Sequence, residues 1–138
     1  MLELKNAIDA KLLDSTIYNS VGGRCYFNTS PTDDQFPRIV YSRVSGVPDN
    51  AFAKTGESVL LQFDLFSMQS AGETEILTME SQLKALLDDC TLTISGQLCV
   101  GFMRQNTVDM VEDLSALQDG SSLVFHTAID YECTYQAT

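Results

Sequence analysis

Basic residues are scarce in this chain, which has 8 lysines and arginines against 19 aspartates and glutamates. The formal net charge is therefore −11 at pH 7. A protein that grips a nucleic-acid backbone needs clustered lysine and arginine to displace the counterions of the phosphates. An anionic membrane surface is disfavoured for the same electrostatic reason. The charge predicts a soluble chain whose surface does not hold on to DNA.

Long hydrophobic runs are also missing. No apolar stretch approaches the roughly 18–20 residues that a helix needs to cross a bilayer. The N-terminal segment MLELKNAIDAKLL mixes acids and bases with its leucines, so it lacks the basic and apolar regions of a signal peptide. We therefore expect the protein to fold in a cytoplasm. With 138 residues, of which 44% are hydrophobic, the chain fits a single domain, residues 1–138.

The usual ligands of zinc are sparse as well. His126 is the single histidine, and the four cysteines contain no C-x-x-C spacing. A zinc site is therefore poorly supported, and scattered cysteines in a cytoplasmic protein are expected to be small buried hydrophobic residues. These cysteines are Cys25, Cys90, Cys99 and Cys133. We predict neither a metal nor a cofactor.

No combination of residues predicts catalysis. The Gly-Gly-Arg of residues 22–24 precedes a strand, whereas a phosphate-binding loop connects a strand to a helix. We expect these glycines to form a turn. Asp33 and Asp34 have no nearby third ligand and are expected to be solvated loop carboxylates. His126 and Asp130 would lie roughly 13 Å apart along a strand, too far for a direct dyad. We expect His126 to be a surface residue, and the chain not to be an enzyme.

Hydrophobic periodicity predicts two helices and six strands. The helices are expected at residues 2–15 and 70–89, and the second has capping-box spacing between Ser70 and Glu73. Its core-facing stripe is Ile76, Met79, Leu83 and Leu86. The strands are expected at residues 24–28, 38–46, 58–67, 91–94, 97–105 and 121–135, with a loop or open hairpin tip at 47–57.

The last strand has the clearest alternation. One face is expected to carry Leu123, Phe125, Ile129, Tyr131, Cys133 and Tyr135, and the other His126, Asp130 and Glu132. The element order is α-β-β-β-α-β-β-β. This order is typical of an α+β protein with an antiparallel (mixed) sheet and its two main helices packed on one face.

The acidic segment 106–120 allows two interpretations. It is either a solvated long loop or an ordered arm whose apolar residues dock on a neighbouring protein, since long connections tend to be functional. The residues assigned to this partner interface are Val108, Asp109, Met110, Val111, Glu112, Asp113, Leu114 and Leu117. Pro48, Asp49 and Lys54, in the polar segment before the third strand, are assigned to it too.

Several motifs together resemble those of the tail terminator, or tail-completion, family of long-tailed bacteriophages. An N-terminal helix is followed by V-G-G-R-C-Y-F at 21–27 and, after a proline-containing loop, by F-P-R-I-V-Y-S at 36–42. A strand from Gly56 to Leu65 and a helix that ends in L-x-x-L-L at 83–87 continue the resemblance. It covers nearly the whole chain in element order.

The resemblance implies a structural role. Proteins of this family form a ring, usually a hexamer, on the last ring of the tail tube. The ring stops elongation of the tube and presents a surface to the connector or stopper proteins of the head. The implied partners are copies of this chain, the tube protein and the head proteins, while genomic DNA passes through the lumen without specific binding. The implied location is the tail or neck of the virion, after synthesis in the bacterial cytoplasm.

Contacts between subunits of such a ring need apolar anchors. Four residues on the outward faces of the strands are candidates, unless a helix covers them: Val40, Leu60, Phe66 and Val124. Two other functions stay open, namely another neck component such as a head-closure protein, and a small cytosolic enzyme or ligand-binding domain. The order of the helix, the VGGR segment and the FPR segment favours the terminator.

Overall fold

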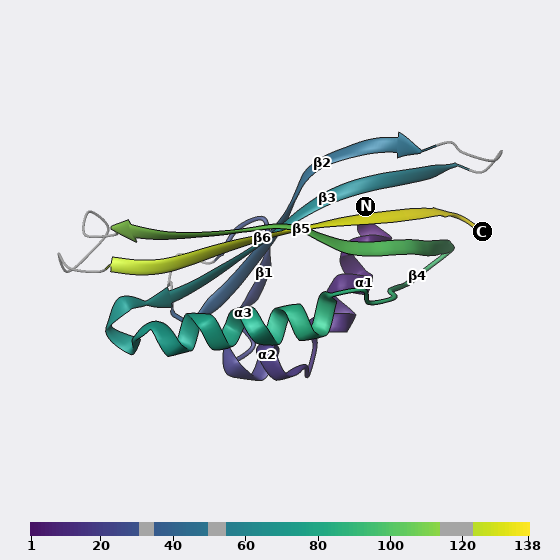
Figure 1. The fold of residues 1–138 in the computed structure, drawn as a ribbon. Coiled ribbons are helices and arrows are strands. Elements are labelled where there is room, and N and C mark those ends of the chain that lie inside the picture. The colour runs from purple at the N-terminus through teal and green to yellow at the C-terminus, as the bar shows by residue number, and fades with distance from the viewer. Residues whose placement is uncertain (31–34, 50–54, 114–122) are drawn as a thin grey trace.

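The computed structural model describes residues 1–30, 35–49, 55–113 and 123–138. These residues form three α-helices, a short 3-10 helix and six strands (Figure 1). The helices are α1 (Leu2–Leu12), α2 (Thr16–Ser20), η2 (Gln69–Ala71) and α3 (Glu73–Leu87). The strands are β1 (Cys25–Phe27), β2 (Arg38–Asp49), β3 (Gly56–Met68), β4 (Thr93–Ile94), β5 (Gln97–Asp113) and β6 (Leu123–Ala137).

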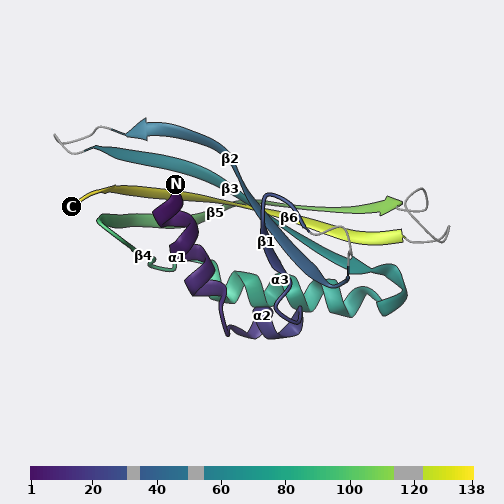
Figure 2. The same ribbon diagram turned by 180° about the vertical axis from the view of Figure 1, so that it is seen from behind.

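All six strands form one sheet in the order β1-β2-β3-β6-β5-β4. β1 pairs with β2 in parallel, and the other neighbours are antiparallel. In the described part of the chain the helices lie on one face of this sheet, as Figures 1 and 2 show from opposite sides. The predicted α+β class, with a mixed sheet and helices on one face, is confirmed.

The core lies between the helices and this face of the sheet. Alternate residues of β3 point into it and have no exposed surface: Val59, Leu61, Phe63 and Leu65. An aromatic row crosses its centre, with ring centroids 5.4 Å apart for Tyr41 and Phe63, 5.8 Å for Phe63 and Tyr131, and 5.1 Å for Tyr131 and Phe102. Such pairs add specific geometry to hydrophobic burial. The predicted alternation of β3 and the C-terminal half of β6 is confirmed.

The N-terminal helix is shorter than expected. α1 ends at Leu12, where the sequence pattern predicts a helix that continues to residue 15. Asp14 has a positive φ of 60°, which a continuing helix does not allow. Ser15 then caps a second helix, α2, by accepting a hydrogen bond of 3.3 Å from the amide of Tyr18. Ser15, which the sequence pattern places at the end of the first helix, therefore begins the second.

The predicted capping box of the long helix does not form. Ser70 lies in η2, and α3 begins only at Glu73, after Gly72 with a φ of 85°. The expected stripe is otherwise confirmed, since Ile76, Met79 and Leu83 are buried. At its end, Leu86 is partly buried against the core and Leu87 is fully buried, because steps of three and of four after Leu83 both stay on the core-facing side.

The glycine turn after α2 is confirmed and connects the two halves of the segment that carries the family resemblance. Gly22 and Gly23 have φ values of 61° and 76°, which glycine adopts without the penalty of a Cβ atom. Arg24, which follows, donates from Nε to the carbonyl oxygen of Pro37 at 2.8 Å. Its Nη2 donates to the carbonyl of Phe36 at 3.3 Å. The arginine of VGGR thus holds the start of FPR beside β1.

We expect Gly23→Ala to destabilise the protein by about 1–2 kcal/mol, the usual cost of a left-handed conformation for a residue with a Cβ. A Cβ at this position would also lie 3.1 Å from Oη and 3.2 Å from Cζ of Tyr18. Urea denaturation of the variant measures the difference. Gly101→Ala is the matched control, because a Cβ there meets no atom within 4 Å, and this variant should be nearly neutral. Equal stability of the two variants would contradict the assignment.

Two segments expected to be irregular are strand. Residues 47–49 pair with 56–58 in an antiparallel hairpin, so the strands extend from both ends into the predicted loop or hairpin tip at 47–57. Asn106–Asp113 belongs to β5 and pairs with β6 as far as Leu123. The interpretation of 106–113 as a solvated loop is therefore wrong, because the segment is an ordered part of the sheet. That its apolar residues dock on a neighbouring protein stays a prediction. Its side chains lack the alternation of buried and exposed residues that reveals a strand, because most of them are exposed.

Candidate interaction surface

The sheet has two long edges that lie mostly uncovered. β1 pairs with β2 only at Ile39–Tyr41, and β4 pairs with β5 only at Gln97 and Leu98. Beyond these short partners, no described strand lies beside Ser42–Asp49 of β2 or Cys99–Asp113 of β5. Such edges present unpaired backbone groups to which another strand can add. The uncovered stretches of β2 and β5 lie along opposite edges of the sheet (Figure 1).

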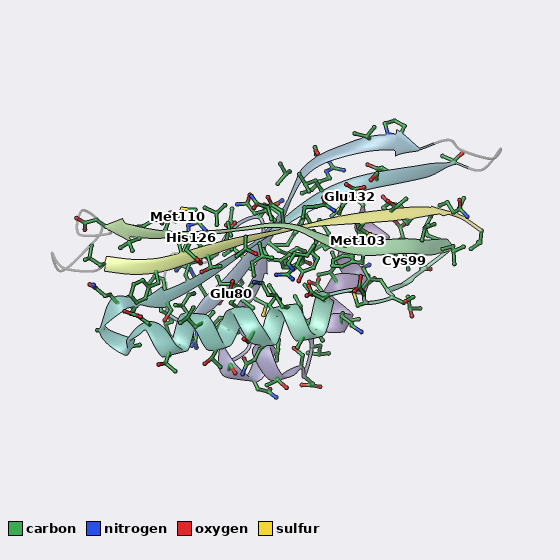
Figure 3. All side chains as sticks on the ribbon, viewed as in Figure 1. Glu80, Cys99, Met103, Met110, His126 and Glu132 are labelled. Carbon is green, nitrogen blue, oxygen red and sulfur yellow. The ribbon has the colours of Figure 1, made fainter. Side chains whose placement is uncertain are left out.

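The predicted interface residues of β5 are largely exposed. Val108, Met110 and Val111 have exposed fractions of 44%, 38% and 57%. Asp109 accepts a hydrogen bond of 2.8 Å from Thr127, and Glu112 contacts His126, while Asp113 ends the strand. Figure 3 places Met110 beside His126, with which it pairs across β5 and β6. The structure therefore brings apolar and acidic side chains together on one strand.

The remaining predicted interface residues divide into two groups. Pro48 is exposed at the penultimate position of β2, and Asp49 is the final residue of that strand. Lys54, Leu114 and Leu117 lie outside the described residues, as do Asp33 and Asp34. Pro48 and Asp49 lie at one end of the sheet, and Val111 to Asp113 at the other, as the strand register requires. They do not form one continuous patch.

The sheet face opposite the helices, here called the open face, is acidic. Its acids are Asp64, Glu112, Asp130 and Glu132, whereas its described basic side chains are Arg38 and His126. Val40, Leu60, Phe66 and Val124 also lie on this face. The described helices lie on the other face, so the alternative that a helix covers these four residues is wrong for those helices. Val124 is nevertheless buried.

His126 is not the surface residue that its sequence context predicts. It is 8% exposed and lies between two carboxylates, with Nε2 2.6 Å from Oδ1 of Asp64 and Nδ1 2.9 Å from Oε1 of Glu112. Burial alone would lower the pKa of His126, but the hydrogen bonds and charges of Asp64 and Glu112 raise it above the ordinary 6.5. Sequence spacing could not reveal this group, since its members come from three strands, and His126 is 62 residues from Asp64 and 14 from Glu112.

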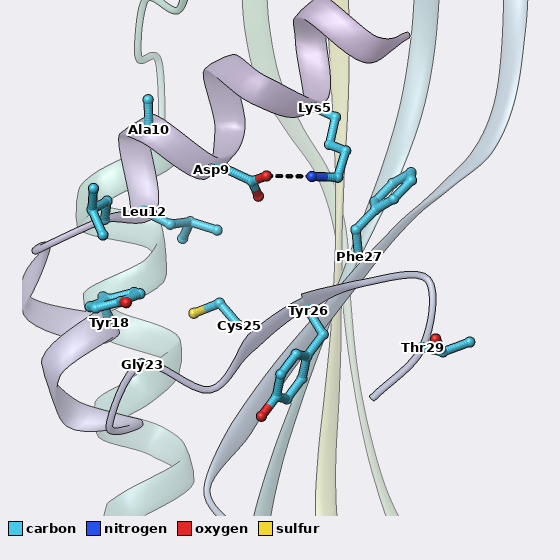
Figure 4. A pocket seen from close by; sticks show the side chains of 11 residues that line it. Lys5, Asp9, Ala10, Leu12, Tyr18, Gly23, Cys25, Tyr26, Phe27 and Thr29 are labelled. Carbon is cyan, nitrogen blue, oxygen red and sulfur yellow. Dashed lines mark hydrogen bonds and ion pairs between the residues drawn. The ribbon is translucent and has the colours of Figure 1, made fainter. Parts of the chain in front are cut away.

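A cavity beside the N-terminal helices has Cys25 in its wall. Its volume is about 600 Å³, and it opens between α1, α2 and β1 (Figure 4). Lys5 and Asp9 form an ion pair of 2.6 Å at its wall. Burial, together with the charge of Asp9, raises the pKa of the Cys25 thiol to about 12, so this thiol stays protonated and is a poor nucleophile at neutral pH.

Two further tests concern metals and membranes. Among the residues that the structure describes, no three histidine, cysteine or acidic side chains are grouped so that they could hold a metal ion. None of the described helices is long and apolar enough to cross a membrane.

Comparison with known proteins gives a family and a fold. The family model described as "Tail completion protein gp17" matches residues 7–134. A solved chain from the "Virion of native gene transfer agent (GTA) particle" is similar in structure, with a TM-score of 0.72 and 11% sequence identity. The match covers 96% of this chain and 97% of that chain. No curated protein matches the sequence.

Proposed function

The chain belongs to the tail completion protein gp17 family, and on this premise we propose that its copies close into a ring on the end of a tail tube. As a member of the family it is a structural protein of a phage-like tail and not an enzyme. The ring would end elongation of the tube and provide the surface on which the connector or stopper of the head docks. The family match over nearly the whole chain is the observation that carries this proposal.

The two uncovered edges support ring formation. A surface on one side of a subunit that binds a different surface on the other side makes head-to-tail contacts, and these close into a ring when the rotation between subunits allows it. β2 and β5 run in opposite directions, because β2, β3, β6 and β5 are successively antiparallel. Rotation about an axis along the strands preserves these directions. β5 of one copy would therefore meet β2 of the next as an antiparallel pair.

The acidic open face suits the wall of a DNA channel. In our proposal this face is turned toward the lumen, where Asp64, Asp130 and Glu132 would repel the phosphates of the passing genome. Six copies would carry a formal charge of about −66, from −11 per chain. A ring whose lumen is basic, with the acids on its outer rim, would contradict this orientation.

Deletion of the gene from the phage or prophage tests the function. We expect heads and tails that fail to join, together with tails of irregular length, in electron micrographs of the lysate. Supplying the wild-type gene on a plasmid is the control and should restore joined particles. Virions of normal appearance and infectivity in the deletion strain would refute the proposal.

A further inference from the structure

The far half of β5, Asn106–Asp113, has few contacts that hold it in place. It pairs with β6 on one side and has no described strand on the other. None of its side chains is buried, and only Thr107 and Glu112 are even half-buried. A segment with so little buried surface opens locally at low free-energy cost. Its order therefore depends strongly on the few side-chain links that it makes.

One of these links runs through a row of side chains on the open face. Arg38, Phe66, His126 and Met110 occupy matched positions on β2, β3, β6 and β5. The imidazole of His126 stacks on the ring of Phe66 with a centroid distance of 4.4 Å, and the guanidinium of Arg38 lies 5.1 Å from the same ring. Phe66 thus shields one side of the imidazole from water.

The hydrogen-bonding geometry of His126 calls for a proton on each ring nitrogen. Each nitrogen faces a carboxylate oxygen, Asp64 on β3 and Glu112 on β5. A neutral imidazole has one N–H and one lone pair, so it can donate to one carboxylate and must turn its lone pair toward the other. An imidazolium donates to both, and charge-assisted bonds of this kind are the stronger ones.

We propose that protonated His126 is an ionic clamp that fastens the far half of β5 to the sheet, and that the clamp releases when the imidazole loses its proton. The link joins Glu112, on a weakly held edge strand, to Asp64, in the centre of the sheet. Release leaves Glu112 and Asp64 on either side of a neutral imidazole, without the cation that had offset their charges. The far half of β5 then opens more often.

The charges around the clamp determine the pH at which it acts. The groups that face the imidazole are Asp64 from β3, Glu112 from β5 and, across the Phe66 ring, Arg38 from β2. Asp130 from β6 lies farther along the strand and acts on Asp64. Two carboxylates in direct contact, against one guanidinium on the far side of the Phe66 ring, favour the imidazolium. Since the pKa of His126 is raised above 6.5 in the folded protein, the stabilisation is fully present below pH 6.5 and is lost as the pH rises through the raised value.

Hydrogen–deuterium exchange of a peptide that covers residues 106–113 measures the opening. Protection factors, corrected for the intrinsic pH dependence of exchange, are compared at pH 6.0 and 9.0, at a dilution where light scattering gives the mass of a single chain. We expect protection in the wild-type protein to fall by at least about threefold between the two pH values. NMR of the single histidine should show a titration midpoint above 6.5. Unchanged protection while His126 demonstrably titrates would overturn the proposal.

Two variants separate the clamp from general loosening. His126→Gln cannot carry the charge, so its protection should be low and equal at both pH values. Asp109→Asn weakens the neighbouring bond to Thr127 and should lower protection while keeping the pH dependence. A pH dependence that persists in H126Q would assign the effect to another group.

The consequence for assembly rests on the proposed function, because β5 is the edge assigned to the contact between subunits. Ring mass is therefore measured by light scattering at high concentration at the same two pH values. We expect less ring at pH 9.0 than at pH 6.0. A change in exchange without a ring at either pH would uphold the clamp and refute the ring. A ring that forms while the exchange of residues 106–113 is the same at both pH values would uphold the ring and refute the clamp.

Discussion

Replacing Phe63 with alanine is expected to lower the free energy of unfolding by about 3–5 kcal/mol, the usual range for a buried aromatic residue. Phe63 has no exposed surface, and its ring lies between Tyr41 and Tyr131 in the aromatic row of the core. Removal of the ring leaves a cavity between Tyr41 and Tyr131 that these two side chains do not fill. Since small domains are stable by only about 5–15 kcal/mol, the loss is a large share of the total. Urea denaturation followed by circular dichroism measures it.

Leu77→Ala is the control for this core substitution. Leu77 is 53% exposed on α3, so its truncation should change stability by less than about 0.5 kcal/mol. A Phe63→Ala variant that unfolds at the same urea concentration as the control would show that the aromatic row does not form the centre of the core.

Replacing Val111 with lysine is expected to weaken ring formation at least about tenfold, which corresponds to about 1.4 kcal/mol per contact. Val111 is 57% exposed on the uncovered edge of β5. A lysine there removes an apolar contact and is one of the side chains by which natural edge strands avoid pairing with another strand. Native mass spectrometry or light scattering at several protein concentrations measures the association.

Leu77→Lys is the matched control, because it makes the same kind of change at a similarly exposed position on the helical side of the molecule. It should form rings like the wild-type chain. Both variants should unfold at nearly the wild-type urea concentration, since neither side chain is buried. If Val111→Lys assembles normally, the β5 edge is not the contact between subunits.

The sequence predicted the fold well where side chains alternate between core and solvent. The strand at 58–67 and the helix from Ile76 to Leu83 are examples, because burial on one face imposes a period of two or of about 3.6 residues. The prediction from the sequence failed where a segment buries neither of its faces. Asn106–Asp113 is held by backbone pairing while its side chains stay exposed, so no pattern of burial marks it as a strand. Ser15 shows a second limit, since a capping residue looks alike before one helix and after another.

The interaction surface could be predicted only in part. The exposed apolar residues Val108 and Val111 stood out as unusual among acids, and this local signal pointed to β5. The surroundings of His126 gave no local signal. Its partners Asp64 and Glu112 come from other strands, and the pairing of β3, β6 and β5 alone brings them within hydrogen-bond distance.

The sequence by itself determined the acidic charge, the α+β order and the short motifs that point to a tail completion protein, because composition, periodicity and local turns depend on neighbouring residues. Only the tertiary structure decided which edges and which face of the sheet the described strands and helices leave uncovered, and that the single histidine lies between two carboxylates. These features depend on the register between strands. A shift of one residue would turn every side chain to the other face, and no local pattern encodes that choice for a strand exposed on both sides.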